Sequence, residues 1–159
     1  MNKVRVLMVC MGNICRSPTA HGVFQSVVDK AGHADWISVD SAGTHAYHVG
    51  SPPDSRAAET AERRGYYLRD QRARKVEVED FGAFDYVLAM DRDNLRDLLA
   101  ICPAEHRAKV RLFLDFQEDA SVTEVPDPYY GGQNGFEYVL DLVERTSELL
   151  LEDIRRNHG

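Results

Sequence analysis

Residues 4–18 read VRVLMVCMGNICRSP, in which an apolar run, Val4–Val9, ends at a cysteine and leads through a short loop to a Ser-Pro pair. A strand of this kind delivers Cys10 to a turn in which Gly12 takes a positive φ and Asn13 tolerates one. Proline costs no hydrogen bond in the first turn of a helix, so a helix begins at the Ser-Pro pair and turns its positive end toward the loop. The stretch therefore predicts an anion-binding cradle that contains a sulfur.

The residue types in this cradle indicate nucleophilic chemistry on a phosphate. Helix N-termini and neighbouring cations lower cysteine pKa values to roughly 3.5–7.5, so Cys10 is expected to be a thiolate near neutral pH. Arg16 supplies a charged fork that matches two phosphate oxygens, and Ser17 supplies a hydroxyl for the sulfur. A buried strand-end cysteine beside an ordinary helix start is the alternative, but the strand, the turn and the helix start together favour the anion site.

The composition is that of one soluble domain spanning residues 1–159, with 43% hydrophobic and 28% charged residues. No apolar run approaches the roughly 20 residues of a membrane span, and no signal-like stretch precedes the first strand, which predicts a cytoplasmic protein without a membrane partner. An odd count of three cysteines indicates a reducing compartment. The cysteines and six histidines show no paired ligand spacing, so neither a metal nor another cofactor is expected.

A net charge of −7 disfavours nucleic acid as a partner, because phosphate backbones are bound through basic stripes. Basic residues do cluster locally, at Arg69, Arg72, Arg74 and Lys75. We interpret this cluster as a solvated face in preference to a docking patch for an anionic substrate. The chain is expected to be a monomer or a weak dimer.

Apolar runs alternate with helical patterns along the chain, which is typical of a parallel sheet covered by helices on both faces. The expected strands are 4–9, 37–40, 84–90 and 110–114, and the expected helices are 18–30, 55–64, 91–101 and 135–156. We therefore predict an α/β fold with a single-domain, four-stranded, parallel, doubly wound sheet of the flavodoxin-like kind.

Ligands in such sheets bind at the carboxyl ends of the strands. Cys10, Ser41 and Asp91 are each expected just after a strand end, so they converge on one edge of the sheet. The stretches 43–53 and 117–134 exceed ordinary connections, which predicts functional loops.

Four stretches in order resemble the low-molecular-weight protein tyrosine phosphatases: CMGNICRS (10–17), DSAGTHAYHVGSPPDSRA (40–57), FDYVLAMDRDNLRDL (84–98) and VPDPYYGG (125–132). The first matches the family signature C-x5-R-S, and the resemblance covers essentially the whole chain. It implies a metal-independent hydrolase that cleaves phosphotyrosine in proteins and aryl phosphate monoesters through a cysteinyl-phosphate intermediate. It also implies that the phosphate-binding loop consists of Met11, Gly12, Asn13, Ile14, Cys15, Arg16 and Ser17.

Expulsion of an alkoxide or phenoxide requires an acid, and hydrolysis of the thiophosphate requires a base. Asp127 stands between two prolines that stiffen its loop, and it matches the aspartate that serves as the family's general acid. A turn-capping role is the alternative for this residue. Tyr129 and Tyr130 on the same loop, and Tyr47 opposite, resemble the walls of the family's substrate cleft. Ordinary surface tyrosines are the alternative.

Further residues match supporting positions of the family. Asn13 and Ser41 resemble its hydrogen-bond network around the cradle, and Asp91 resembles the carboxylate that braces the active-site arginine, with a helix N-cap as the alternative role. Gln71 stands where eukaryotic members often carry histidine, which weakens the inference about the outer network.

Cys15 resembles the second cysteine with which relatives trap an oxidised nucleophile, here Cys10, as a reversible disulfide. A small loop residue without a redox role is the alternative. A related arsenate reductase would need a downstream cysteine pair, and only Cys102 is present. A relative that acts on phosphoarginine carries threonine at the place of Ile14. A non-catalytic phosphate-binding or thiol-sensing module would need no acid.

Overall fold

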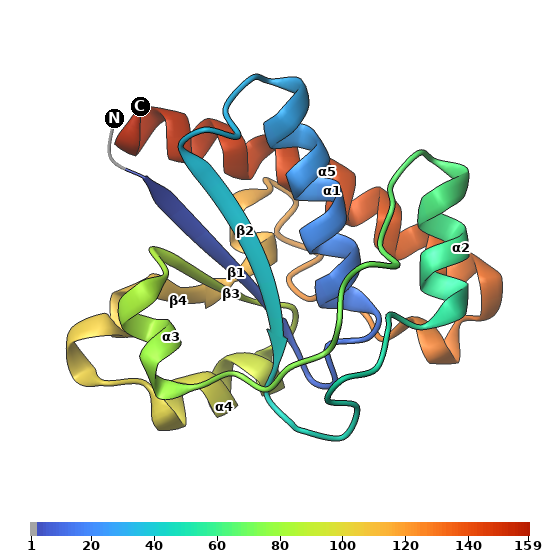
Figure 1. The fold of residues 1–159 in the computed structure, drawn as a ribbon, viewed down its shortest axis with the longest axis horizontal. Coiled ribbons are helices and arrows are strands. Elements are labelled where there is room, and N and C mark those ends of the chain that lie inside the picture. Colours follow the sequence, from blue (N-terminus) through green and yellow to red (C-terminus); the bar gives the residue numbers. More distant parts are fainter. Residues whose placement is uncertain (1–2) are drawn as a thin grey trace.

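The fold is a four-stranded parallel sheet with helices packed on both faces (Figure 1). The structure is a computed structural model that describes residues 3–159, apart from the side chain of Tyr130. The strands, in the sheet order β2-β1-β3-β4, are β2 (Ile37–Gly43), β1 (Val4–Cys10), β3 (Tyr86–Ala89) and β4 (Val110–Leu112). All neighbouring pairs are parallel, so the predicted doubly wound architecture is confirmed.

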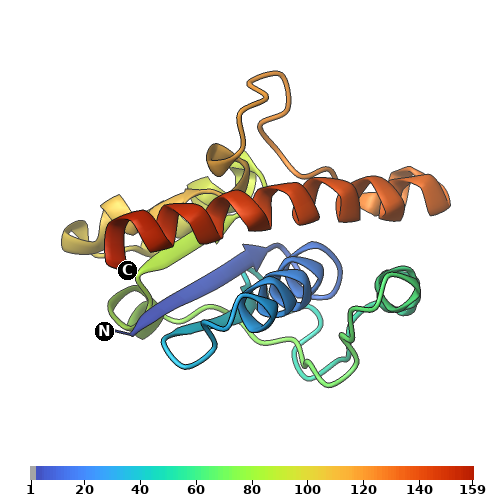
Figure 2. The same ribbon diagram turned by 90° about the horizontal axis from the view of Figure 1, so that it is seen from above.

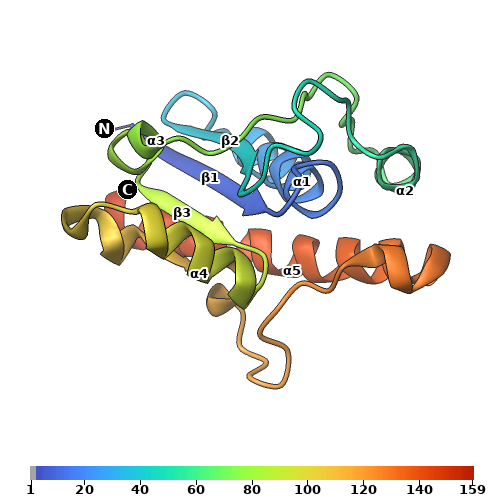
Figure 3. The ribbon, with the colours of Figure 1, turned by 90° about the horizontal axis from the view of Figure 1, so that it is seen from below.

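Helices α1 (Arg16–Lys30) and α5 (Gly132–His158) cover one face, and α3 (Val78–Ala83) and α4 (Arg92–Ile101) cover the other (Figures 1 and 3). The remaining α-helix, α2 (Ser55–Arg63), packs beside α1 and α5. Figure 2 shows α5 running along the length of the molecule. Among residues 3–159 no helix combines the length and the apolar character needed to cross a membrane.

The central strand β1 supplies both halves of the core. Val6 and Met8 pack with α1 and α5, whereas Leu7 and Val9 pack with α3 and α4. Successive side chains of a strand point to opposite faces, and both faces of this sheet are covered, so these four residues are all fully buried.

Element boundaries depart from the prediction where pairing or capping decides them. Strand β2 runs on to Gly43, because Cys10 and Gly43 are paired in register, so Ser41 lies inside the strand and not after it. Strands β3 and β4 are shorter than predicted, and a short 3-10 helix, η2 (Phe113–Phe116), follows β4. Helix α3 was not predicted, because its six residues are too few to show a helical period.

Two further 3-10 helices are η1 (Ala104–Lys109) and η3 (Pro128–Tyr130), and η3 lies inside the predicted functional loop 117–134. Helix α5 begins before the predicted start at 135 and ends after 156. The loop is therefore shorter than the sequence indicated, and it ends in helical structure.

The carboxyl end of β2 is covered by an extended segment. Gly43 N donates to Arg74 O and Val76 N donates to Gly43 O, both at 2.8 Å. This segment, residues 74–76, also contacts the loop that follows β1, because Arg74 N donates to Asn13 Oδ1 at 3.0 Å, and the residue after β2 joins them through a bond from Thr44 N to Cys10 O at 2.9 Å. Three chain segments thus meet at the edge of the sheet where the sequence places the anion cradle.

Candidate active site

The sulfur of Cys10 lies buried at the end of β1 and receives two polar contacts from the loop that follows. Asn13 N donates to Cys10 Sγ at 3.3 Å, and Ser17 Oγ lies 3.0 Å from the same sulfur. The helix α1 begins at Arg16, one residue before the predicted Ser-Pro start. The positive end of its dipole therefore faces the sulfur and favours negative charge there.

The tight turn of the cradle is made by Asn13 and not by Gly12. Asn13 has φ 57°, whereas Gly12 does not have a positive φ, so that part of the sequence prediction is wrong. A Cβ at position 12 would lie 3.0 Å from the imidazole carbon Cδ2 of His48, an exposed side chain, so a larger residue there would require the His48 ring to shift by a few tenths of an ångström. The amide side chain of Asn13 can hydrogen-bond locally, which makes the left-handed conformation accessible to it.

Arg16 reaches across the cradle to the start of α4 and to the irregular segment that precedes the acid loop. Its Nη1 donates to Asp91 Oδ2 at 2.6 Å and to Val125 O at 3.1 Å. Burial by itself would lower the pKa of Arg16, but the negative charges of Cys10 and Asp91 outweigh it, so the pKa is raised and the guanidinium stays charged. Asp91 also accepts from Asn94 N through Oδ1, so it caps α4 and braces the arginine at once.

A pocket of about 70 Å³ brings the predicted residues of the cradle and of the acid loop together. Asp127 lines it from the start of η3, and its carboxylate also accepts from Tyr129 N at 3.0 Å, which is the turn-capping role. The pocket is lined by Cys10, Met11, Gly12, Ile14, Cys15, Arg16, Tyr47, His48, Asp127 and Tyr129. Asn13 and Ser17 are buried beneath this surface. The side chain of Tyr130 lies outside the part of the chain that the structure describes.

Two aromatic side chains from different loops line the pocket. Tyr47 is 70% exposed and stacks on His45 at a centroid distance of 5.1 Å. Tyr129 donates its hydroxyl to Asp54 Oδ2 at 3.0 Å, and the guanidinium of Arg56 lies 4.7 Å above its ring. Burial and the neighbouring Cys15 raise the pKa of Tyr129 to about 12, so its hydroxyl stays neutral and remains a donor.

Cys15 forms part of the wall behind the nucleophile. Its side chain is buried with Ala57 and Phe136. Burial and the nearby carboxylate of Asp54 raise the pKa of this thiol to about 12. Cys15 is therefore a protonated thiol at neutral pH, in contrast to a reactive thiolate.

Ser41 belongs to an outer hydrogen-bond network that leads through Gln71 to the first turn of α1. Among the hydrogen bonds of residues 3–159, Ser41 Oγ contacts His21 Nδ1 and Gln71 Oε1, both at 3.3 Å, and not Asn13. Gln71 Nε2 in turn donates to Pro18 O at 3.0 Å, in the first turn of α1. The amide at position 71 therefore hydrogen-bonds to the start of the cradle helix.

Sequence reasoning missed three residues near the cradle. His48 lines the pocket. His21 contacts Ser41 Oγ through Nδ1, and burial lowers the pKa of its imidazole. Arg74 N donates to Asn13 Oδ1 at 3.0 Å. A lone histidine with no partner at a meaningful spacing gives no sequence signal. Arg74 belongs to the basic cluster interpreted as a solvated face, and no sequence pattern distinguishes it from the other members.

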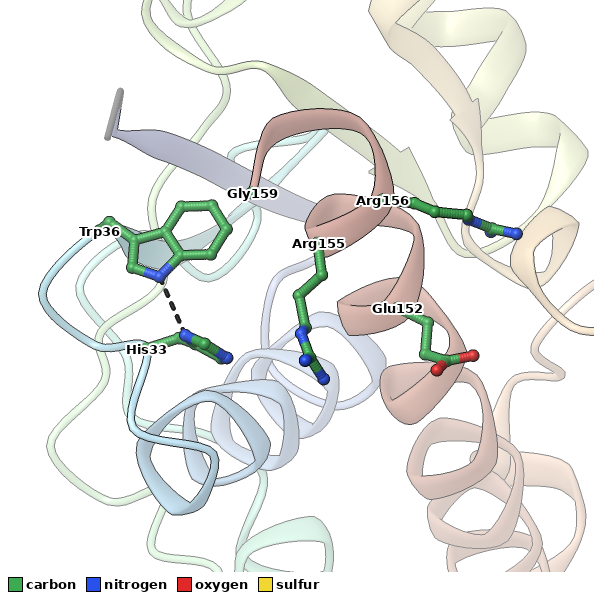
Figure 4. A pocket seen from close by; sticks show the side chains of 6 residues that line it. All are labelled: His33, Trp36, Glu152, Arg155, Arg156 and Gly159. Carbon is green, nitrogen blue, oxygen red and sulfur yellow. Dashed lines mark hydrogen bonds between the residues drawn. The ribbon is translucent and has the colours of Figure 1, made fainter.

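A larger hollow than this pocket lies at the N-terminal end of β2 (Figure 4). It has a volume of about 470 Å³ and lies between Trp36 and the last turns of α5. Trp36 Nε1 donates to His33 Nδ1 at 3.0 Å inside it. This hollow contains none of the predicted site residues. Within residues 3–159, no group of three or more His, Cys, Asp or Glu side chains is placed to hold a metal.

Comparisons with known proteins agree with this geometry. The sequence model of the low molecular weight phosphotyrosine protein phosphatases matches residues 5–159. A protein of that name from Schizosaccharomyces pombe is 44% identical over 149 residues, which cover 92% of this chain and 95% of the relative. A crystal structure of a protein tyrosine phosphatase from Entamoeba histolytica, with Hepes in its active site, superposes with a TM-score of 0.94 at 40% identity, over 99% and 100% of the two chains. YfkJ from Bacillus subtilis superposes with a TM-score of 0.94 at 36% identity, over 100% and 99%.

Proposed function

The chain belongs to the low molecular weight phosphotyrosine protein phosphatase family, and we propose that it hydrolyses phosphotyrosine in proteins, and aryl phosphate monoesters, through a cysteinyl-phosphate intermediate. One observation carries the proposal: Cys10 and Arg16, from the loop after β1, line one pocket with Asp127, which is more than 100 residues away in the sequence. A nucleophile, a cation that matches a phosphate and an acid are the groups that this reaction needs.

The first step forms a sulfur–phosphorus bond as the ester bond breaks. The phosphate dianion is held by the N–H groups of residues 11–17 and by the guanidinium of Arg16, which Asp91 keeps in orientation. The thiolate of Cys10 attacks phosphorus opposite the leaving oxygen. The same donors stabilise the charge that spreads over the equatorial oxygens in the transition state, because they are already in place when it forms.

Asp127 serves both halves of the reaction. It protonates the leaving oxygen in the first step and then takes a proton from the water that attacks phosphorus in the second. The sulfur–phosphorus bond breaks, inorganic phosphate is released, and the departing thiolate accepts a hydrogen bond from Ser17 Oγ, 3.0 Å away. The hydrogen bond from Tyr129 N fixes the direction of the Asp127 carboxylate.

The substrate is a flat aryl phosphate on a protein. Tyr47 and Tyr129 line the pocket, and we propose that their rings contact the leaving group and that Tyr130 is a third residue of this aromatic wall. Ile14 gives the pocket an apolar residue, which favours phosphotyrosine over phosphoarginine. The net charge of −7 supports the absence of a nucleic-acid partner, and the cysteine usage supports a cytoplasmic location. We further propose a monomer or weak dimer without a membrane partner.

The arsenate reductase alternative is disfavoured by the position of Cys102. This cysteine follows the last residue of α4, whereas Asp91, beside Arg16, precedes the first. A helix of ten residues is about 15 Å long, so Cys102 is far from the nucleophile. A cysteine relay through Cys102 would need a large rearrangement of a packed helix.

Steady-state hydrolysis of matched phosphotyrosine, phosphoserine and phosphoarginine peptides tests the proposal, with Cys10→Ser as the blank. Phosphotyrosine is expected to be turned over fastest. Asp127→Ala should slow the turnover of poor leaving groups by about 10²-fold, because it removes the acid. Competitive inhibition of the Asp127→Ala variant by inorganic phosphate should be the same as that of the wild type. Equal turnover in Asp127→Ala and wild type would show that Asp127 is not the general acid. Residual turnover in Cys10→Ser would show that Cys10 is not the nucleophile.

We also propose that Cys15 protects the nucleophile from irreversible oxidation. Peroxide converts the Cys10 thiolate to a sulfenic acid, and Cys15, as it loses its proton, attacks that sulfur and expels hydroxide, which leaves a disulfide. A dithiol reductant then restores both thiols. Because the pKa of Cys15 is raised, little of it is thiolate and this attack is slow. For the same reason Cys15 itself is protected from other thiol-reactive compounds.

The protective role predicts a difference between two variants. Activity of wild type and of Cys102→Ser should return after peroxide and then dithiothreitol, whereas Cys15→Ser should lose it permanently. Mass spectrometry should find a disulfide between residues 10 and 15 in the first two proteins. Equal recovery of activity in Cys15→Ser and wild type would show that Cys15 has no protective role and is only a small residue in the wall of the pocket.

A further inference from the structure

Arg74 is held between two carboxylates beside the end of β2. Its Nη1 and Nη2 donate to the two oxygens of Asp80 at 3.0 and 3.2 Å. Its Nε and Nη2 donate to Asp40 Oδ2 at 3.3 and 3.2 Å. Neighbouring Arg72 is exposed and donates to the backbone carbonyls of Arg69 and Gln71. Arg74 is thus the member of the basic cluster that is tied to both β2 and α3.

The backbone of Arg74 lies between the sheet and the cradle. Its carbonyl accepts from Gly43 N at 2.8 Å, and its N–H donates to Asn13 Oδ1 at 3.0 Å. Gly43 leaves no room between these layers, because a Cβ there would lie 2.7 Å from Met11 O and 3.2 Å from Asn13 N. Any displacement of the backbone at Arg74 is therefore transmitted to the cradle.

Asn13 connects that contact to the nucleophile. Its Nδ2 donates to Ser17 Oγ at 2.8 Å, and its N–H donates to Cys10 Sγ at 3.3 Å, while Ser17 Oγ lies 3.0 Å from the same sulfur. Asn13 is also the one non-glycine residue of positive φ in the described chain. Such a conformation persists only where the surrounding structure holds it. The amide of Asn13 is held at Oδ1 by Arg74 and at Nδ2 by Ser17.

We propose that Arg74 is a positioning residue for the phosphate cradle: by gripping Asp40 and Asp80 it keeps its own N–H on Asn13, and so keeps the N–H of Asn13 directed at the nucleophile. The inference rests on the proposed function for its catalytic readout. It applies equally to phosphate binding by the cradle, which can be measured without turnover. The bidentate fork matters here, because an ammonium at this position would serve the two carboxylates only as a point charge.

Replacement of the side chain tests the proposal against a matched control two residues away. Arg74→Met should lower kcat about tenfold and weaken inorganic phosphate as a competitive inhibitor by a similar factor, because small displacements of positioned groups are costly. Arg74→Lys should recover part of both losses. Arg72→Met, which removes an exposed guanidinium from the same segment, should leave both unchanged. Equal kcat and phosphate inhibition in Arg74→Met and wild type would overturn the proposal.

A double-mutant cycle with Asn13→Ala identifies the route. If Arg74 acts through Asn13, Arg74→Met should add no further loss of kcat in the Asn13→Ala background. Losses that multiply would show that Arg74 acts by another path and would contradict the proposal. A lowered melting temperature with unchanged phosphate affinity would also contradict it, since that result describes a purely structural residue.

Asp40→Asn and Asp80→Asn keep the test usable if Arg74→Met does not fold. Each removes one of the two negative charges that face the Arg74 guanidinium. Each also retains a side-chain oxygen that can accept from the backbone N–H already bound there, which is Ser41 N at Asp40 and Glu77 N at Asp80. Each should weaken phosphate binding relative to the wild type. Protection of Cys10 from alkylation by inorganic phosphate supplies the readout if the wild type does not hydrolyse phosphotyrosine, so failure of the proposed function remains distinguishable. Unchanged protection in both variants would refute the positioning role.

Discussion

The cradle, residues 10–17, and the acid loop, residues 126–131, line one pocket but are built differently. In the cradle Cys10, Asn13, Arg16 and Ser17 are all buried, whereas the acid loop exposes 45% of Tyr129 and part of Asp127. Donors that stabilise a transition state must be fixed before it forms, and a proton donor must also exchange with solvent. The buried cradle therefore suits the stabilisation of the transition state, and the more exposed acid loop suits proton donation.

The two regions also differ in how they are held. Two other parts of the chain hydrogen-bond to the cradle and its helix. Gln71 and Arg74 do so from the segment 71–76, and Asp91 does so from the N-terminus of α4. The acid loop is attached at its base, where Val125 N donates to Met90 O at 2.8 Å, and at its tip by Tyr129. Arg16 links the two regions through Val125 O. Disturbance of the cradle is therefore expected to cost more than disturbance of the loop.

The largest effect is expected from Gly43→Ala, which would place a Cβ 2.7 Å from the backbone oxygen of Met11. Because backbone atoms cannot move aside as a flexible side chain does, kcat/KM should fall about hundredfold. The free energy of unfolding should fall by about 1–3 kcal/mol, measured by urea denaturation. Gly82→Ala is the matched control, since its Cβ would meet only His106 Nε2, at 3.5 Å. Normal activity in Gly43→Ala would mean that the cradle tolerates displacement.

Asp91→Asn should have the next largest effect. It retains an acceptor that can cap α4 but removes the charge that faces Arg16, whose side chain is only 7% exposed. Loss of a charge-assisted hydrogen bond should reduce kcat/KM about tenfold. Asp93→Asn, which breaks the exposed pair with Arg96, is the control and should change little. If both variants behaved alike, the brace on Arg16 would have no catalytic consequence.

The smallest effect is expected from Tyr129→Phe, which removes the hydrogen bond to Asp54 at the tip of the acid loop. An exposed neutral donor contributes little net free energy, so kcat/KM for phosphotyrosine peptides should fall by about two- to fivefold. Tyr67→Phe, another exposed tyrosine, should leave it unchanged. A loss larger than that of Asp91→Asn would show that the acid loop, and not the cradle, needs the firmer support.

The sequence predicted the elements whose signals are local. The strand β1, the helix start after Cys10 and the role of Asp91 as an N-cap follow from apolar runs, proline and capping chemistry at neighbouring positions. The end of β2 was missed because pairing with β1, and not the composition of residues 41–43, extends that strand. The sequence allowed a positive φ at both Gly12 and Asn13, and the structure has it at Asn13 alone, because both residue types suit such a turn and only packing chooses between them.

By itself, the sequence determined the alternation of strands and helices, and it placed a cysteine, an arginine and an aspartate after strand ends or in long loops. Those properties depend on residues close together in the chain, so they are readable without coordinates. Only the tertiary structure decided that Asp127 shares a pocket with Cys10, that Arg74 and not Ser41 hydrogen-bonds to Asn13, and that His48 lies against Gly12. These contacts join residues more than 30 positions apart, and their geometry depends on how the whole sheet and its covering segments pack.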